Sequence, residues 1–294
     1  MMGPSRGPTD VLCVACQQPM HLHSLGEQGL WVHVCPGCYG TWLAAGQLEA
    51  IKQSHVAEIL DKKTSWKTWL FQFLLALPVE FNLKPKAFAW VTFSLLALNT
   101  LAFAALLLGP TETLVLGYAL YPALVGEQQW WVSLFSHQFL HGGFLHIGMN
   151  LYFLYILGDN VEDALGHVGF ITFYLLCGVA GGVAHTLIDG GSTTPMLGAS
   201  GAISGVMAAY AVFFRRAKLT FMLVVFQFKL SAMAYVGVWL ALNVAGLLMG
   251  GQGVAWGAHL GGFGLGLVLA LALDGVVLTH RPLVRLLRNH RRAL

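Results

Sequence analysis

Long apolar stretches alternate with short polar segments over the last two thirds of the chain. A helix needs about 20 apolar residues, at about 1.5 Å per residue, to cross the hydrocarbon core of a bilayer. The pattern therefore predicts an all-α polytopic membrane protein with six transmembrane helices, of which the second and fourth are short and carry polar residues. The stretches lie near residues 87–109, 144–158, 168–188, 200–214, 231–250 and 255–275.

The same pattern divides the chain into four parts. Residues 1–50 form a compact polar unit, 51–86 a linker, 87–276 the membrane domain and 277–294 a basic cytoplasmic tail. In the linker, aromatic and aliphatic residues recur at helical spacing beside lysines. This spacing predicts a helix lying in the membrane interface or, equally, a helix packed on the N-terminal unit.

Composition and charge agree with a place in the bilayer. Hydrophobic residues make up 56% of the chain and charged residues only 10%, whereas about 25% are charged in ordinary soluble domains. All 16 Lys and Arg lie within residues 6–86, 215–229 and 281–292. With six spans, this bias predicts that both termini are cytoplasmic. The first twelve residues have no apolar core and predict no signal peptide.

The basic tail carries five arginines between residues 281 and 292. They would mark the cytoplasmic side, and binding of lipid head groups or nucleic acid is the alternative interpretation. Because the net charge is only +3, we expect no nucleic-acid partner.

Two close pairs of cysteines lie in the N-terminal unit. Cys13 and Cys16 are followed, after 18 residues, by Cys35 and Cys38. Each CxxC turn presents two thiolates to one tetrahedral ion, so the spacing predicts a structural zinc site. Two disulfides or an iron centre are the alternatives. His21 and His23 are further candidate ligands, and the fifth cysteine, Cys177, is expected to be a small packing residue.

The run from Cys35 to Glu49, which reads CPGCYGTWLAAGQLE, resembles zinc ribbons of the transcription-factor-IIB type over about 40 residues. The resemblance implies a small zinc ribbon. It leaves the role of the ribbon open, with a cytosolic partner, zinc sensing and stabilisation of the N-terminus as the alternatives.

Two polar residues stand at the starts of apolar helices. Ser200 lies in a GASG run at the start of the fourth span, and His259 lies in an AHLGG run at the start of the sixth. A serine there is also a good helix cap, and small residues also serve helix packing. The predicted topology brings both starts to the outer side, however, so we expect Ser200 and His259 to form a catalytic pair. The glycine stripes Gly201/Gly205 and Gly257/Gly261 would then face each other.

A third element precedes the second span. His146 and Asn150 are one helical turn apart and share a face at its outer end. Their side-chain donors could stabilise an oxyanion, and hydrogen bonds to loop backbone are the alternative.

Together, HxxxN at His146 and Asn150, GDNVE at 158–162, GASG and AHLGG resemble the rhomboid family over residues 87–276. The resemblance implies a six-helix rhomboid bundle and an intramembrane serine endopeptidase. Ser200 would be the nucleophile and His259 the general base, with no cofactor for catalysis. His146, Asn150 and the backbone N–H groups of Ala199 and Ser200 would form the oxyanion hole. Substrates would be single-span membrane proteins.

The chain departs from the family pattern in two places. Where many members have an aromatic residue that stacks on the histidine, this chain has Ser204, so Ser204 or Tyr210 would have to support His259. Asp274 lies about four turns away, which favours a Ser-His dyad over a triad. The family's Trp-Arg pair in the first outer loop is also missing, because Trp130 and Trp131 are followed by valine and serine.

Two other functions compete with proteolysis. One is a non-proteolytic rhomboid-like protein that binds transmembrane helices, and the other is a transporter or channel. The near absence of charged residues from the spans and of an internal repeat argues against the second. For the location we expect an integral, multi-pass protein of a bacterial inner membrane.

Overall fold

The computed structural model divides the chain into two compact units. One comprises Met1–Lys86, Thr220–Phe228 and Leu278–Leu294, and the other Ala87–Leu219 and Lys229–Val277. The described residues are 2–25, 30–38, 40–43, 70, 78–80, 88–215, 217–223, 226–251 and 253–280. Apart from residues 70 and 78–80, the predicted linker helix lies outside them, as does the basic tail from residue 281 onward.

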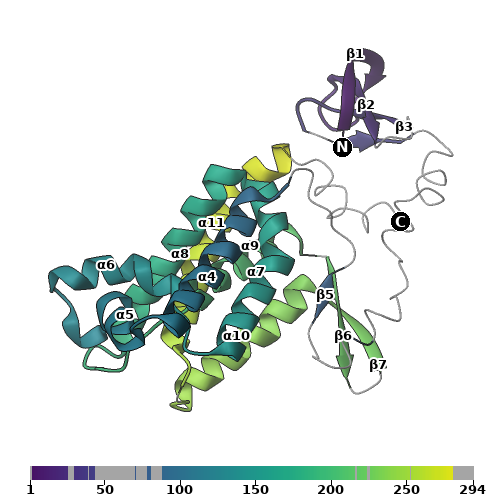
Figure 1. Cartoon of the computed structure of the whole chain (residues 1–294). Helices are drawn as coiled ribbons and strands as arrows, with labels where there is room; N and C mark the ends of the chain where they lie inside the picture. The colour runs from purple at the N-terminus through teal and green to yellow at the C-terminus, as the bar shows by residue number, and fades with distance from the viewer. Residues whose placement is uncertain are drawn as a thin grey trace. The chain divides into compact units, whose positions relative to one another are not determined.

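Strands form the described part of the N-terminal unit up to Leu43 (Figure 1). Neighbouring strands are antiparallel, in the order β1-β2-β3-β4. The two CxxC turns lie at the β1–β2 and β3–β4 connections, so the two hairpins bring the cysteine pairs to one place. The strands are β1 Met2–Leu12, β2 Pro19–Leu25, β3 Leu30–Val34 and β4 Thr41–Trp42.

Helices form most of the second unit, as the apolar stretches predict. They are α4 Trp90–Leu108, α5 Thr111–Tyr118, α6 Gln128–Ser136, α7 Phe144–Leu165, α8 His167–Ile188, α9 Ser200–Phe213, α10 Ala232–Leu248 and α11 Trp256–His280. Two short 3-10 turns, η1 Pro122–Leu124 and η2 His137–Phe139, lie before α6 and after it.

A three-stranded sheet was not predicted. Its order is β5-β6-β7, with β5 at Val79–Glu80, β6 at Lys218–Leu223 and β7 at Phe226–Ser231. Strands β6 and β7 connect α9 to α10, in the basic segment 215–229 between the fourth and fifth predicted spans.

Each predicted apolar stretch forms a helix, but the helices differ in length. Among the described residues, Trp90–Leu108, His167–Ile188 and Trp256–Val277 are long and apolar enough to cross a bilayer. A fourth span results if Trp130–Phe139 and Phe144–Leu165, which meet at an 80° bend, count as one. A membrane protein of mainly helical fold is thus confirmed. Six crossings remain a prediction, because α9 and α10 are shorter.

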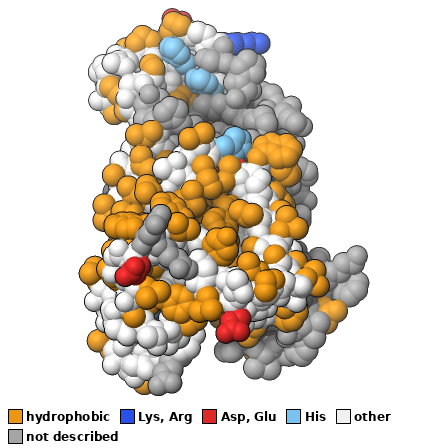
Figure 2. Space-filling view, turned by 60° about the vertical axis from the view of Figure 1, so that its left-hand side comes forward, with side chains coloured by type: hydrophobic (Ala, Val, Ile, Leu, Met, Phe, Trp, Pro, Cys, Tyr) orange, Lys and Arg blue, Asp and Glu red, His pale blue; other side chains and the backbone are white. Residues whose placement is uncertain are grey.

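The helix surfaces suit contact with lipid. Leu101, Leu187 and Leu248, on three different helices, are 67%, 82% and 80% exposed. Figure 2 shows hydrophobic side chains over most of the helical surface in view, with few charged side chains among them. Exposed apolar area on this scale is rare on soluble monomers and is expected where hydrocarbon replaces water.

Helix α9 is the central helix of the bundle. Every one of its residues after Ser200, from Gly201 to Phe213, is buried. It packs against α7, α8 and α10, and its glycines meet the backbone of α11. Ser200, the first residue of α9, is only half-buried. It is therefore the one residue of this helix that is not buried.

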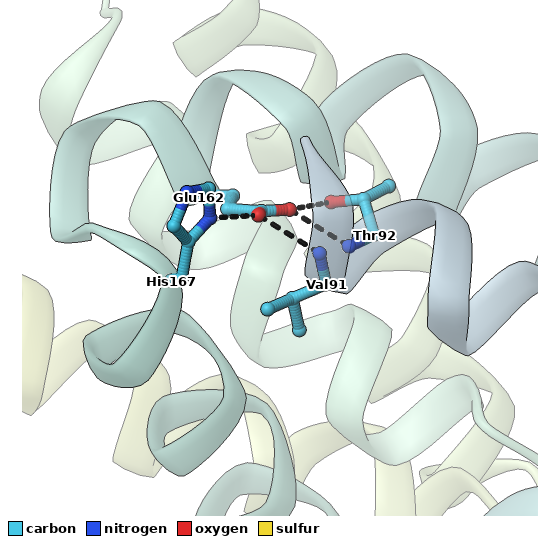
Figure 3. A network of polar contacts seen from close by, with 4 residues as sticks. All are labelled: Val91, Thr92, Glu162 and His167. Atoms are coloured by element: carbon cyan, nitrogen blue, oxygen red, sulfur yellow. Dashed lines mark hydrogen bonds and ion pairs between the residues drawn. The ribbon is translucent and has the colours of Figure 1, made fainter. Parts of the chain in front are cut away.

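Helix α7 continues beyond its predicted end and carries a buried carboxylate. Glu162 is 1% exposed, and its oxygens accept hydrogen bonds from the backbone N–H groups of Val91 (2.9 Å) and Thr92 (2.7 Å). The Thr92 hydroxyl donates a further hydrogen bond of 2.7 Å to Glu162 Oε2. His167 Nδ1 lies 2.5 Å from the other carboxylate oxygen, Oε1 (Figure 3).

These contacts replace the missing cap of α4. The residue before α4, Ala89, offers no side-chain acceptor to the first N–H groups of the helix. Such groups otherwise have no partner, and a carboxylate at a helix N-terminus also complements the helix dipole. Glu162 therefore joins the starts of α4 and α8 to the end of α7.

We expect Glu162→Gln to destabilise the bundle by about 2 kcal/mol, because charge-assisted hydrogen bonds to a buried acceptor are lost. Thermal unfolding in detergent micelles measures the effect. The control is Glu112→Gln, which removes an exposed carboxylate on α5. Equal melting temperatures for the two variants would contradict the role of Glu162.

Candidate active site and metal centre

The segment before Ser200 is fixed by backbone hydrogen bonds. Met196 and Leu120 exchange two of them, at 2.8 and 2.9 Å, and the N–H of Gly198 donates to the carbonyl of His137 at 2.9 Å. The N–H of Ala199 points to His141 Nε2, at 3.5 Å. Bonds to Leu120 before α6, to His137 in η2 and to His141 after η2 thus fix the backbone that leads into α9.

Gly198 makes this path possible. Its φ of +127° lies in a region that residues with a side chain rarely adopt. A Cβ at this position would lie 2.7 Å from His146 Nε2 and 3.8 Å from Ser200 Oγ. The imidazole of His146 therefore packs directly against the turn that presents Ser200.

His146 and Asn150 lie on α7 as predicted. His146 Nδ1 accepts a bond of 3.4 Å from the N–H of Gly142, which leaves Nε2 as the protonated nitrogen on the side of Gly198. Asn150 is buried and donates to the carbonyl of His146 at 3.0 Å. One N–H of its amide takes part in that bond, and the other is a further donor.

His259 meets a partner that the sequence analysis did not identify. Its Nδ1 lies 2.7 Å from Oδ1 of Asn243, which is 3% exposed on α10. The Asn243 amide nitrogen donates to the carbonyl of Trp239 at 2.8 Å. An amide in an otherwise apolar run was the available signal, since a polar side chain inside a membrane helix needs a partner.

Two indoles flank the His259 ring. The Trp239 ring centroid lies 6.0 Å from it at 33°, and the Trp256 centroid lies 6.2 Å from it at 84°. Trp256 Nε1 donates to the Gly251 carbonyl at 2.8 Å, and a Cβ at Gly246 would overlap this indole. The aromatic neighbours of His259 thus come from α10 and from the start of α11 instead of α9.

Neither of the residues suggested for that role supports His259. The Ser204 hydroxyl donates to the carbonyl of Ser200 at 2.6 Å, within α9. Tyr210 packs on Phe214, about 15 Å along the helix from Ser200. Asp274 lies within 4.0 Å of Arg215, at the opposite end of α9 from Ser200, which agrees with the expectation that it is no partner of His259.

Close backbone contacts join α8, α9 and α11, but with a different glycine register from the predicted one. A Cβ at Gly201 would lie 3.3 Å from the Ala258 carbonyl, and one at Gly262 would overlap the carbonyl of Gly201. Gly266 meets Gly205 in the same way. The α9 stripe therefore faces Ala258, Gly262 and Gly266.

Gly257 and Gly261 instead face α8. A Cβ added at Gly257 would meet His185 and Ile188. One added at Gly261 would meet Ala180, Gly181 and Ala184. The prediction that Gly257 and Gly261 face α9 was therefore wrong by one residue along α11. Successive residues of a helix point about 100° apart, so the glycines face α8 instead. Ala258 is the residue before His259, and Gly201 follows Ser200, so the two helix starts still meet.

The polar contacts of Ser200 and His259 remain separate. Among the described residues, no hydrogen bond joins Ser200 Oγ to the imidazole. Such bonds are often long in the absence of substrate and tighten when it binds. Both side chains are half-buried, so both have an accessible part.

The four N-terminal cysteines form one cluster. Their Sγ atoms lie within 4.8 Å of one another, with separations of 3.4 Å for Cys13–Cys38 and Cys16–Cys35. A disulfide would need about 2.05 Å, and all four thiols are free. The edge of a tetrahedron with Zn–S bonds of about 2.3 Å is about 3.8 Å, so the set fits zinc.

Backbone donors prepare two of these thiols for a metal. The Cys38 N–H lowers the pKa of Cys35 to about 6, and the N–H groups of Cys16 and Ala15 lower the pKa of Cys13. Hydrogen bonds within the cluster raise the pKa of Cys16. The N–H groups of the turns favour thiolates, and the thiolate is the form that binds metal.

Comparison with known families identifies both parts of the chain. The family described as "Rhomboid domain" matches residues 127–274, and the family described as "Transcription factor zinc-finger" matches residues 12–54. The first match contains the α7, α9, α10 and α11 residues described above, and the second contains all four clustered cysteines.

Relatives cover the same region. The chain is 31% identical over 147 residues to Rhomboid protein 1, mitochondrial, of Saccharomyces cerevisiae, covering 47% of this chain and 40% of that protein. It is 32% identical over 169 residues to RHOMBOID-like protein 5 of Arabidopsis thaliana, covering 56% and 53%. It is also 34% identical over 131 residues to Presenilin-associated rhomboid-like protein A, mitochondrial, of Danio rerio, covering 42% and 33%. The chain thus spans about half or less of these relatives.

We expect Gly262→Ala to lower both the stability and any activity of the bundle, because the methyl group would push α11 away from the Gly201 carbonyl. An effect of about 2 kcal/mol is typical of overpacking, and melting temperature in detergent measures it. Gly264→Ala on the same helix is the control, since its Cβ would meet nothing within 4 Å. Equal stability of the two variants would contradict the close contact.

For the cysteine cluster we expect one zinc ion per chain, measured by mass spectrometry of the metal in purified full-length protein. Cys35→Ser should lower the zinc content strongly, because one of four thiolate ligands is lost. Cys177→Ser, a change at a buried thiol on α8, should leave it unchanged. Iron in place of zinc, or equal zinc in both variants, would refute the assignment.

Proposed function

Because this chain belongs to the rhomboid family, as its match over residues 127–274 shows, we propose that it is an intramembrane serine endopeptidase. The observation that carries this proposal is the meeting of two helix starts. The residue after Ser200 touches the residue before His259, although α9 and α11 begin 56 positions apart. A serine with a histidine near enough to act as its base is the minimum for nucleophilic catalysis by a dyad.

The length of α9 supports a site within the membrane. Its 14 residues reach about 21 Å, which is less than the hydrocarbon thickness of about 30 Å. A helix whose cytoplasmic end lies near the basic residues 215–218 would then start below the outer surface. Ser200 would lie at that depth, in a cavity that also admits water.

The proposed reaction is acyl transfer. His259 takes the Ser200 hydroxyl proton while Oγ attacks the scissile carbonyl carbon, and the carbonyl oxygen becomes an oxyanion. When the C–N bond breaks, His259 gives the proton to the leaving amine, and an acyl ester on Ser200 remains. Water then hydrolyses the ester in a second cycle of the same proton transfers.

Several donors could hold the oxyanion. The N–H groups of the first turn of α9, beginning with Ser200, have no partner within the helix, and the helix dipole favours negative charge there. His146 Nε2–H lies beside them, and Asn150 has a further N–H. The predicted Ala199 N–H already faces His141 Nε2, so Ala199 would have to exchange that contact for the oxyanion.

We further propose single-span membrane proteins as substrates and the lipid bilayer as the medium of the reaction. Both termini would be cytoplasmic, as the positions of the basic residues indicate. The bacterial inner membrane stays a prediction, and the mitochondrial names of two relatives offer a second setting. The zinc ribbon would contact a cytosolic partner, with no nucleic acid involved, and zinc would be structural.

The test is cleavage of a single-span reporter by protein reconstituted in liposomes. We expect Ser200→Ala and His259→Ala to lose activity by at least about 10³-fold. Ser204→Ala is the matched control, because it removes a hydroxyl from the same helix that only bonds backbone. If wild type and Ser200→Ala cleave equally across several reporters, the protease proposal fails and a helix-binding, non-proteolytic role takes its place.

A further inference from the structure

The buried face of α10 contains one side chain with an amide or a charge. Its buried residues are Ala232, Val236 and Asn243, and of these only Asn243 can form hydrogen bonds through its side chain. The alternative to a partner would be an amide in hydrocarbon, which is costly. Asn243 meets that need with two bonds, one to a backbone carbonyl and one to the imidazole of His259.

The Trp239 carbonyl fixes which way the amide points. An amide can present either its oxygen or its NH2 group to an imidazole, and the two choices give opposite tautomers. Here the NH2 group donates to the Trp239 carbonyl at 2.8 Å, because a carbonyl can only accept. The atom left to face His259 Nδ1, at 2.7 Å, is therefore the oxygen.

An oxygen at that position fixes the proton on His259. Oδ1 of Asn243 can only accept, so Nδ1 must carry the proton and donate it. In the neutral ring Nε2 is then unprotonated, which is the state that a general base requires. A serine protease normally assigns this tautomer through a carboxylate, and among the described residues none contacts His259.

We propose that Asn243 is a positioning residue that holds His259 in the Nδ1–H tautomer, with Nε2 free to take the proton of Ser200. The proposal rests on the proposed protease function for its catalytic consequence but not for the tautomer itself. Trp239 contributes twice, because its carbonyl orients the amide and its indole flanks the imidazole. The hydrogen bonds of Asn243 go to the Trp239 carbonyl and to His259, so it would act through His259 and not on the substrate.

The first experiment measures the tautomer without any need for activity. Full-length Ser200→Ala protein with ¹⁵N-labelled histidine is compared with the double variants Ser200→Ala/Asn243→Leu and Ser200→Ala/Asn243→Asp. The His259 signals, among those of 12 histidines, are assigned by their loss in His259→Gln. We expect Nε2 of His259 to give the unprotonated-nitrogen signal in Ser200→Ala and in the Asn243→Asp variant, because both have an acceptor oxygen at this position. The Asn243→Leu variant should show a mixture of both tautomers.

The second experiment measures reporter cleavage in liposomes. We expect Asn243→Leu to lower kcat about 10²-fold, the scale of a general base's contribution, with little change in KM. Asn243→Asp, which keeps an acceptor oxygen, should recover kcat to within about tenfold of wild type.

Asn99→Leu is the matched control for a merely structural role. Asn99 is also a buried amide in an apolar helix, 1% exposed, and it also donates to the carbonyl four residues earlier, Leu95, at 2.7 Å. Among the described residues, no hydrogen bond joins Asn99 to His259. We expect its loss to change melting temperature and to leave kcat and the tautomer unchanged.

The outcomes separate the two proposals. A wild type that cleaves no reporter and whose Ser200 does not react with a fluorophosphonate would refute the protease function, while the ¹⁵N spectra still decide on Asn243. An unchanged His259 signal in the Asn243→Leu background, or an unchanged kcat in a cleaving enzyme, would overturn the positioning role. A tautomer change in the spectra together with a fall in kcat that Asn99→Leu does not reproduce would support it.

Discussion

The site depends on one steric constraint, the absence of side chains where α9 and α11 cross. The carbonyl of Gly201 occupies the space that a Cβ of Gly262 would need, and Gly205 and Gly266 repeat this contact about one helical turn further along. Within lipid, close packing of this kind replaces the hydrophobic effect as the force between helices. It also limits how far Ser200 lies from His259, because Ser200 precedes Gly201 and His259 follows Ala258, and these two neighbours are in contact.

A second group of contacts concerns polar atoms that the bilayer cannot solvate. Glu162 satisfies the first N–H groups of α4, whose own cap position carries alanine. Asn243 pairs with His259, and the N–H of Gly198 pairs with the carbonyl of His137. In each case the partner comes from another helix or segment. Such bonds are costly to leave unmade in an apolar medium, so they fix relative positions that apolar packing alone would leave adjustable.

The sequence predicted the helices better than their partners. Long apolar stretches mark spans directly, and two CxxC pairs mark a metal cluster, because both signals are local. The starts of α9 and α11 were matched through topology, but the facing glycines were wrong by one residue, since rotation of a helix about its axis depends on packing. Asn243 and the tryptophans beside His259 were missed for the same reason: their relation to His259 exists only after α10 packs. The strands β6 and β7 were missed because residues 215–229 were interpreted only through their basic residues, as a cytoplasmic connection between two spans, although each strand carries only one lysine.

The helices that form the site are held unequally. Thirteen residues of α9 are buried, whereas α10 has three buried residues over its 17. Yet α10 carries Trp239 and Asn243, which flank and orient His259, while Ser200 and His146 are fixed by α9, α7 and the Gly198 turn. A small displacement of α10 would therefore turn the imidazole without moving Ser200 or His146. In the proposed mechanism, the alignment of His259 with Ser200 thus depends on the least buried of these helices.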